Sequence, residues 1–245
     1  MFSDITLKQD KCTVLSRLRG YRPRILFLLL ALFAGQVLAA PALNNNQAAE
    51  GLKALLEQGS DLAIRQLGQN GGFSQNPKWR IPLPKTLQKP AQLMRNLGQG
   101  AMVDELENNL NSAAEQAIPH ARELLVSSIR QMSLQDARQI LSSHPTAATE
   151  YLDRTSRAEL RQRFLPIVQE TTAGSPMIRQ YNQLAGQASG FGLGKNKSLS
   201  AEDYVTDKAL DALFGVIAEQ ESSLRANPAK ATGSLLKGVL EAFRR

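Results

Sequence analysis

The segment Phe73–Pro84 reads FSQNPKWRIPLP and interrupts a chain of 245 residues that is otherwise patterned for helices. It contains Trp79, which is the one tryptophan of the chain, and three of the eleven prolines. Each proline fixes its φ angle, lacks a backbone N–H and drives the residue before it towards extended geometry. The sequence therefore predicts an extended Pro-rich segment that runs across the surface or between helices.

On both sides of this segment, apolar residues recur with the i, i+3, i+4 spacing of amphipathic helices, as at Leu52, Leu55 and Leu56. No stretch alternates apolar and polar residues in the manner of a half-buried strand. Pro166 falls inside a helical pattern and is expected to kink it. We expect an all-α fold, an irregular multi-helix bundle of about ten helices, several of them kinked, with the one extended Pro-rich segment.

Serine residues mark three expected helix starts. Ser133 is positioned as an N-cap for residues 134–141. Ser156 and Ser200 each open a pattern typical of a capping box, with an acidic residue three positions later. We therefore expect a short helix over residues 147–154 to end before a second helix that begins after Ser156.

Residues 1–39 have the composition of a secretory signal peptide. A basic stretch precedes the apolar run Ile25–Ala34, and small residues follow, so cleavage is expected after Ala39. An uncleaved membrane anchor is the alternative, but the run is shorter than the ~20 apolar residues that span a bilayer. We expect an exported, soluble periplasmic protein in which residues 40–46 are a polar leader and residues 47–245 form a single helical domain.

Charge and cysteine content limit the partners of the exported chain. Residues 1–39 carry six basic and two acidic residues, so they account for +4 of the net charge of +7 and leave +3 for the rest. This small excess argues against a nucleic-acid partner. Cys12, the one cysteine, also lies in this stretch, so we expect no disulfide, no thiol nucleophile and no lipid anchor after cleavage. We also expect no transmembrane anchor once residues 1–39 are removed.

Motifs for catalysis and for metal or phosphate binding are weak. His120 and His144 are not accompanied by the spacing of a zinc site. Ser175 lacks the strand and the G-x-S-x-G context of a nucleophile elbow. Gly190–Lys195 fits neither the P-loop nor the dinucleotide-binding pattern and is expected to be a loop. We therefore assign no catalytic residue, no metal ligand and no cofactor.

Two rows of like charge fall at helical spacing, where their members share one helix face. The acidic row is Asp203, Asp207 and Asp211, and the basic row is Arg154, Arg157 and Arg161. A row of like charges is unfavourable by a few tenths of a kcal/mol per pair. The acidic row is therefore a candidate solvated face, ion-pair face or hard-cation site, and our hypothesis is that the two rows meet and clamp the domain.

Trp79 and Arg80 form a candidate binding lip, because an indole ring offers a flat apolar face beside a cation. The alternative is that Trp79, Ile81 and Leu83 pin the Pro-rich segment onto the helices. Tyr204 is a third candidate binding residue.

Short motifs in order along the chain carry a resemblance to a known family. They are Gly72-Phe73, Asn76-Pro77, RIPLP at 80–84, AEQA at 114–117 with Pro119, FLPIV at 164–168, YNQL at 181–184 and YVTDKALD at 204–211. On these motifs, residues from about Gln47 to Phe243 resemble the bacterial domain-of-unknown-function 4197 family. The resemblance implies an exported, mostly helical protein of Gram-negative bacteria, and it carries over no activity and no catalytic residue.

These features favour a non-enzymatic periplasmic binding protein for a small apolar or amphiphilic ligand held between helices, where bundles bind small molecules. The alternative is a protein–protein interaction module of the cell envelope that uses Trp79 and the charged rows. A third, less favoured interpretation is an uncharacterised hydrolase with an acid/base pair drawn from Asp207, Glu115 and nearby arginines. No feature of the sequence sets an oligomeric state.

Overall fold

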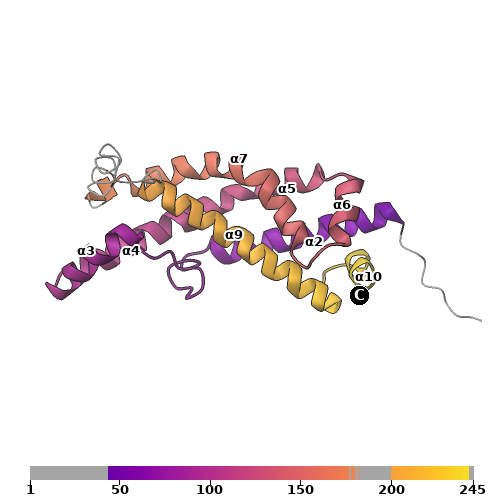
Figure 1. The fold of residues 1–245 in the computed structure, drawn as a ribbon, viewed down its shortest axis with the longest axis horizontal. Helices are drawn as coiled ribbons and strands as arrows, with labels where there is room; N and C mark the ends of the chain where they lie inside the picture. Colours follow the sequence, from indigo (N-terminus) through magenta and orange to yellow (C-terminus); the bar gives the residue numbers. More distant parts are fainter. Residues whose placement is uncertain (1–43, 177, 180–181, 183–199, 243–245) are drawn as a thin grey trace, which may run out of the picture. The chain divides into compact units, whose positions relative to one another are not determined.

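The computed structural model describes residues 44–176, 178–179, 182 and 200–242, and these lie in one compact unit, Leu43–Arg245. Every regular element in these ranges is a helix (Figure 1), which confirms the all-α class. None of the helices in the same ranges is long and apolar enough to cross a bilayer. The expected signal peptide at 1–39 and the loop at 190–195 lie outside the described residues.

The helices are identified by the labels of Figure 1. In chain order they are α2 (Asn45–Leu67), α3 (Lys85–Asn96), α4 (Gly100–Ala117), the 3₁₀ turn η1 (Ile118–Ala121), α5 (Arg122–Arg130), α6 (Leu134–Leu141), α7 (Ala147–Thr172), α9 (Ala201–Ala226), the 3₁₀ turn η2 (Pro228–Lys230) and α10 (Ser234–Ala242).

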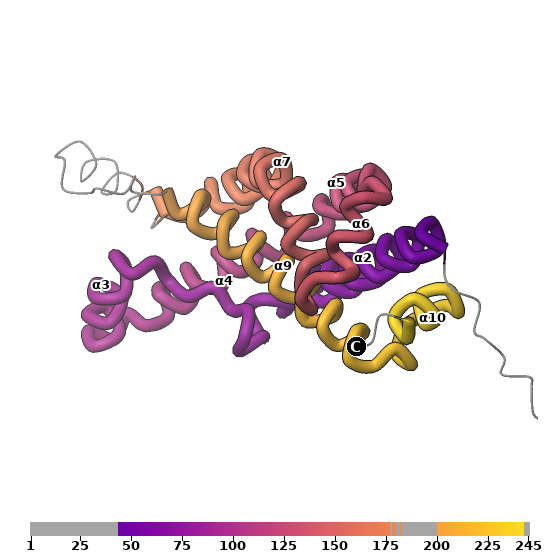
Figure 2. The backbone as a smooth tube through the Cα atoms, turned by 45° about the vertical axis from the view of Figure 1, so that its right-hand side comes forward, coloured from indigo at the N-terminus to yellow at the C-terminus, as the bar shows by residue number. Residues whose placement is uncertain are grey.

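The core forms where the long helices α2, α7 and α9 meet. α9 packs against α7 and α2, α4 packs against α7, and α5, α6 and α10 flank α2 (Figure 2). Apolar stripes meet there, with Leu56, Phe164 and Leu213 fully buried. Gly51 allows α10 to approach α2 closely, since a Cβ on Gly51 would lie 2.5 Å from a methyl carbon of Val239.

α7 corrects the expectation of about ten helices, because the described helices are fewer and longer. The expected break before Ser156 is wrong, and a single helix runs through Ala147–Thr172. Ser156 is 1% exposed, and its hydroxyl donates to the carbonyl of Leu152 at 2.6 Å instead of capping a helix. Leu152, Ser156, Leu160, Phe164 and Val168 are all buried. This buried stripe at four-residue spacing outweighs the capping signal, because burial of a continuous helix face contributes more than a cap.

The other expected caps are confirmed. The hydroxyls of Ser133 and Ser200 accept from the third residue of α6 and of α9. α2 begins at Asn45, inside the expected polar leader, because Asn44 and Gln47 form a reciprocal capping box.

The Pro-rich segment Phe73–Pro84 is not helical, and its two halves differ. Its first half folds in turns up to Trp79, and its second half, from Arg80 to Pro84, has no regular secondary structure. Its apolar side chains Phe73, Ile81 and Leu83 are buried. The segment therefore packs onto the core as it connects α2 to α3.

Candidate functional site

The two charged rows meet between α7 and α9. The Arg161 guanidinium donates to Asp203 at 2.5 Å and to Asp207 at 2.9 Å, and Arg157 donates to Asp211 at 3.0 Å. Hydrogen bonds to Asp207 and Asp203 raise the pKa of Arg161 above its usual value. The three aspartates therefore bind arginines of α7.

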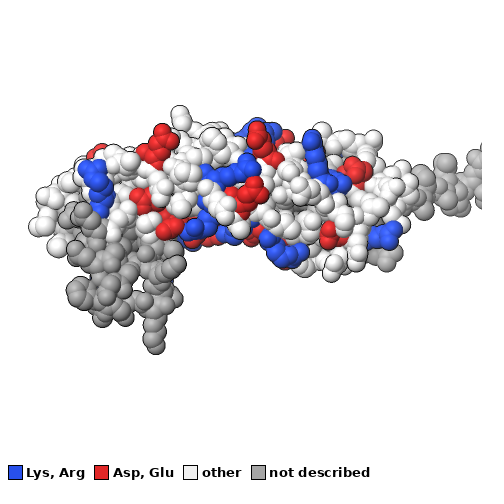
Figure 3. All heavy atoms as spheres, turned by 90° about the horizontal axis from the view of Figure 1, so that it is seen from above, with Lys and Arg blue, Asp and Glu red and all other residues white. Residues whose placement is uncertain are grey.

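Arg154 does not join this arrangement. Its guanidinium carbon lies 5.7 Å from the centre of the Tyr151 ring, and its side chain lines an open hollow on α7 with Arg157 and Arg161. Figure 3 shows basic and acidic side chains interspersed on one face of the molecule. No group of three or more His, Cys, Asp or Glu among the described residues could hold a metal ion.

Trp79 lies against α9. A Cβ on Gly215 would lie 2.3 Å from the Trp79 ring, so this glycine creates the space that the indole occupies. Lys78 lies 5.2 Å from the centre of the same ring and forms an ion pair with Glu219 of α9. The indole is partly buried against the core and joins the Pro-rich segment to α9.

Arg80 and Tyr204 join the same segment to α4 and α9. The Arg80 guanidinium donates to Glu107 of α4 at 2.6 Å. The Tyr204 hydroxyl donates to the carbonyl of Pro82 at 3.1 Å. The candidate binding residues thus contact the segment or belong to it, and each of them makes an internal contact.

Two buried polar residues of α4 hold the Pro-rich segment, and sequence reasoning gave neither this role. Asn111 is 1% exposed; its side-chain oxygen accepts from the Ile81 N–H at 2.8 Å, and its amide donates to the Ile81 carbonyl at 3.0 Å. Glu115 accepts from the backbone N–H groups of Phe73 and Ser74, each at 3.0 Å. The sequence did contain an indication of this role, because these two polar residues lie four positions apart on the apolar stripe of α4.

A third buried polar residue, Glu221 of α9, caps the start of α7. It is 1% exposed and accepts from the N–H groups of Ala148 at 3.1 Å and Thr149 at 2.8 Å. Thr146, which precedes α7, makes no side-chain cap of its own. The Glu221 carboxylate therefore satisfies N–H groups of a helix first turn that would otherwise be buried without partners.

The histidines lie at the surface. His144 is near Thr146 at 3.2 Å and Glu150 at 3.4 Å. His120 lines a second open hollow beside Arg122 and Arg163. Both histidines are therefore exposed, and the hydrogen-bond partner of His144 is the hydroxyl of the neighbouring Thr146.

The α3–α4 hairpin carries three of the five large apolar side chains that are exposed among the described residues. α3 packs against α4 and lies at one end of the described helices in both ribbon and tube views (Figures 1 and 2). Leu93, Leu97 and Met102 are 60%, 69% and 50% exposed. Gly98, at φ +78°, forms the turn between the two helices. These three residues therefore form an exposed apolar tip, which no sequence motif singled out.

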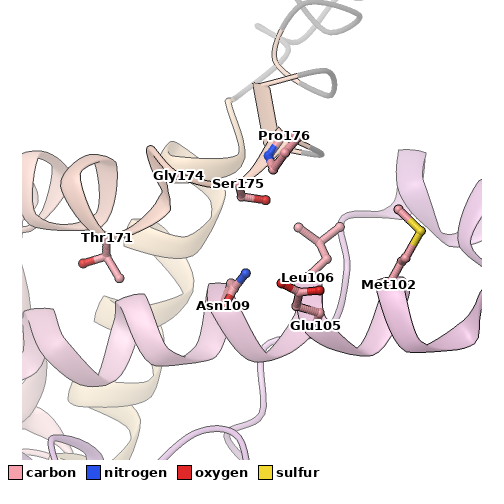
Figure 4. Close-up of a pocket in the computed structure, with 8 residues that line it drawn as sticks. All are labelled: Met102, Glu105, Leu106, Asn109, Thr171, Gly174, Ser175 and Pro176. Carbon is pink, nitrogen blue, oxygen red and sulfur yellow. The ribbon is translucent and has the colours of Figure 1, made fainter.

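A hollow of about 390 Å³ lies beside this tip, between α4 and the end of α7 (Figure 4). Met102 belongs both to the tip and to the lining of the hollow. The remaining lining residues are Glu105, Leu106, Asn109, Thr171, Gly174, Ser175 and Pro176. The apolar tip therefore continues into a recess of mixed polarity.

A family described as "Protein of unknown function (DUF4197)" has a model that matches residues 42–241. The chain belongs to this family, as its motifs predicted, and the match runs from α2 into α10 and includes the hairpin. A search of the curated proteins and a search of the solved structures each returned no match.

Proposed function

We propose that this protein is a non-catalytic binding protein of the periplasm that docks on an amphiphilic partner through the tip of its α3–α4 hairpin. The observation that carries the proposal is the exposure of Leu93, Leu97 and Met102 on a hairpin that lies at the end of the described helices. The composition of residues 1–39 supports export. A cluster of large apolar side chains at the surface is typical of an interaction site.

The hairpin packs on the core through residues other than those of the apolar tip. α3 already turns Leu87, Ala91 and Met94 towards the core. On the α4 side, Arg95 donates to Asp104 at 2.5 Å and to Glu107 at 3.5 Å. The hairpin is therefore held closed by its inner contacts, and Leu93 and Leu97 remain available to a partner.

The energy of the tip suits reversible docking. Burying the exposed 60%, 69% and 50% of these three side chains would contribute about 3–5 kcal/mol, since a fully buried Leu or Met contributes about 1.5–3 kcal/mol. A binding free energy of that size corresponds to a dissociation constant of about 1 mM. A functional complex therefore needs further contacts beside the tip.

The competing functions have weaker support. Four of the residues around the hollow beside α4, namely Glu105, Asn109, Thr171 and Ser175, are polar, whereas a pocket for a small apolar ligand is lined mainly by apolar side chains. An acid/base pair for hydrolysis would need Asp207 or Glu115. Asp207 is bound to Arg161, and Glu115 is bound to two backbone N–H groups.

Site-specific photo-crosslinking in living cells tests this proposal. A photoreactive residue at position 97 should give discrete adducts, whether the partner is protein or lipid. The matched control is position 235, because Leu235 is also an exposed leucine, at 41%, on a different helix. The proposal is wrong if position 97 gives no adduct, or gives the same adducts as position 235.

A further inference from the structure

One row of exposed side chains runs the length of α3. Lys85, Lys89, Leu93 and Leu97 follow one another at a spacing of four residues and are all exposed. Because the helix turns about 100° per residue, each member lies about one turn further along the axis and about 40° further round it. We call these four residues the α3 ridge. It has two lysines near the start of the helix and two leucines at the hairpin tip.

The charge of the ridge is not neutralised within the described residues. Neither Lys85 nor Lys89 forms an ion pair with them, whereas Arg95 is paired with Asp104 and Glu107. α3 has no acidic residue in its first turn. A cation in the first turn of a helix opposes the helix dipole, so Lys85 is unfavourably placed for stability, and an anionic surface would compensate for this.

Along the axis of α3, the lysines of the ridge lie further from the hairpin tip than the leucines do. At 1.5 Å per residue, Lys89 lies about 6 Å behind Leu93 and about 12 Å behind Leu97. Interfacial helices insert their apolar side chains roughly 5–10 Å into the boundary between headgroups and acyl chains. Long lysine side chains can then extend to reach the headgroups.

We propose that the α3 ridge docks tip-first on a lipid bilayer that bears anionic headgroups. This inference rests on the proposed function and names its partner. Leu93, Leu97 and the neighbouring Met102 enter the apolar boundary, while Lys85 and Lys89 contact lipid phosphates.

A bilayer suits this surface better than a folded protein does. A specific protein interface buries about 800 Å² on each partner, and a hairpin tip with three exposed apolar side chains offers much less unless the partner wraps around it. A fluid bilayer surface accepts a projecting tip without a complementary groove. The lysines supply the additional contacts that the apolar tip lacks.

Vesicle flotation with the purified protein tests the proposal. The protein should bind vesicles of phosphatidylcholine mixed with phosphatidylglycerol, and bind vesicles of phosphatidylcholine alone much more weakly. Each lysine near an anionic surface contributes about 1 kcal/mol, so Lys85→Gln with Lys89→Gln should weaken binding about 30-fold. Leu93→Ser with Leu97→Ser should abolish flotation.

Two matched controls should leave flotation unchanged. Lys230→Gln with Lys237→Gln removes the same charge at exposed positions elsewhere. Leu134→Ser with Leu235→Ser removes exposed leucines that are 46% and 41% accessible. Circular dichroism melts confirm that each variant is folded.

The outcomes separate this inference from the proposed function. Equal binding to both kinds of vesicle, or equal loss in the controls, overturns the ridge as an anionic-lipid surface. Absence of flotation together with a protein adduct at position 97 overturns the lipid partner and retains the proposed function. Absence of both overturns both.

Discussion

Replacing Asn111 by alanine should strongly destabilise the protein, because this side chain fixes the second half of the Pro-rich segment at Ile81. Its oxygen accepts from the Ile81 N–H at 2.8 Å, and its amide donates to the Ile81 carbonyl at 3.0 Å. Ile81 is 2% exposed, so water cannot readily replace either bond. The substitution therefore leaves one buried donor and one buried acceptor without partners.

The magnitude follows from these two groups. Each buried polar group without a partner costs about 1–3 kcal/mol, which gives about 4 kcal/mol for Asn111→Ala. For a domain of about 200 residues, this would lower the melting temperature by about 8–16 °C. Asn111→Asp should be at least as unstable, since a carboxylate of the same size cannot donate to the Ile81 carbonyl and would bury a negative charge beside that oxygen.

Urea denaturation followed by circular dichroism measures the effect. The control is Asn108→Ala, which removes an exposed asparagine from the same helix and should change the free energy of unfolding by at most about 0.5 kcal/mol. If the free energy of unfolding of Asn111→Ala lies within about 1 kcal/mol of that of this control, the reasoning about buried partners is refuted.

Three further predictions concern other contacts. Glu221→Gln should destabilise the protein by about 2–4 kcal/mol in urea denaturation, because one amide group cannot accept all the bonds that the carboxylate accepts at the start of α7; an effect below that of an exposed Glu→Gln control would contradict the cap. Gly215→Ala should cost about 1–3 kcal/mol through overlap with the indole and much less in a Trp79→Ala background, so strictly additive losses in a double-mutant cycle would argue against the contact. Hydrogen bonds from Ser133 lower the pKa of Asp136 below its usual value of 3.8, so its stabilising contribution is full above that value and is lost as the pH falls through the folded-state pKa. The difference in free energy of unfolding between wild type and Asp136→Asn should therefore shrink towards zero on acidification, and a constant difference would refute the assignment.

Helix class and the Pro-rich interruption were predictable because they depend on local chemistry. Proline removes a backbone donor wherever it occurs, and serine caps such as Ser133 act within one turn. The break before Ser156 was predicted wrongly for the same reason. The capping pattern is local, whereas the buried stripe that overrides it gains its energy from contacts with other helices.

The site was less predictable, because its parts are set by tertiary contacts. The sequence around Trp79 is compatible with a binding lip. Only the contact of the ring with Gly215, on a helix far along the chain, reveals that the indole packs against α9. The spacing of Leu93 and Leu97 fits a buried helix face as well as an exposed one, and only their exposure in the structure shows that they face outward. Asn111 and Glu221 bind backbone groups that are 30 and 72 or 73 residues away, which no local pattern reveals.

The central claim is that the tip of the α3–α4 hairpin is the surface through which the protein binds an amphiphilic partner. Its most direct test is a single cysteine at position 97 that carries an environment-sensitive fluorophore, with the same label at position 235 as the control. On addition of isolated cell-envelope membranes, the emission from position 97 should shift to the blue while that from position 235 does not move. An unchanged emission at position 97, or the same shift at both positions, would contradict the claim.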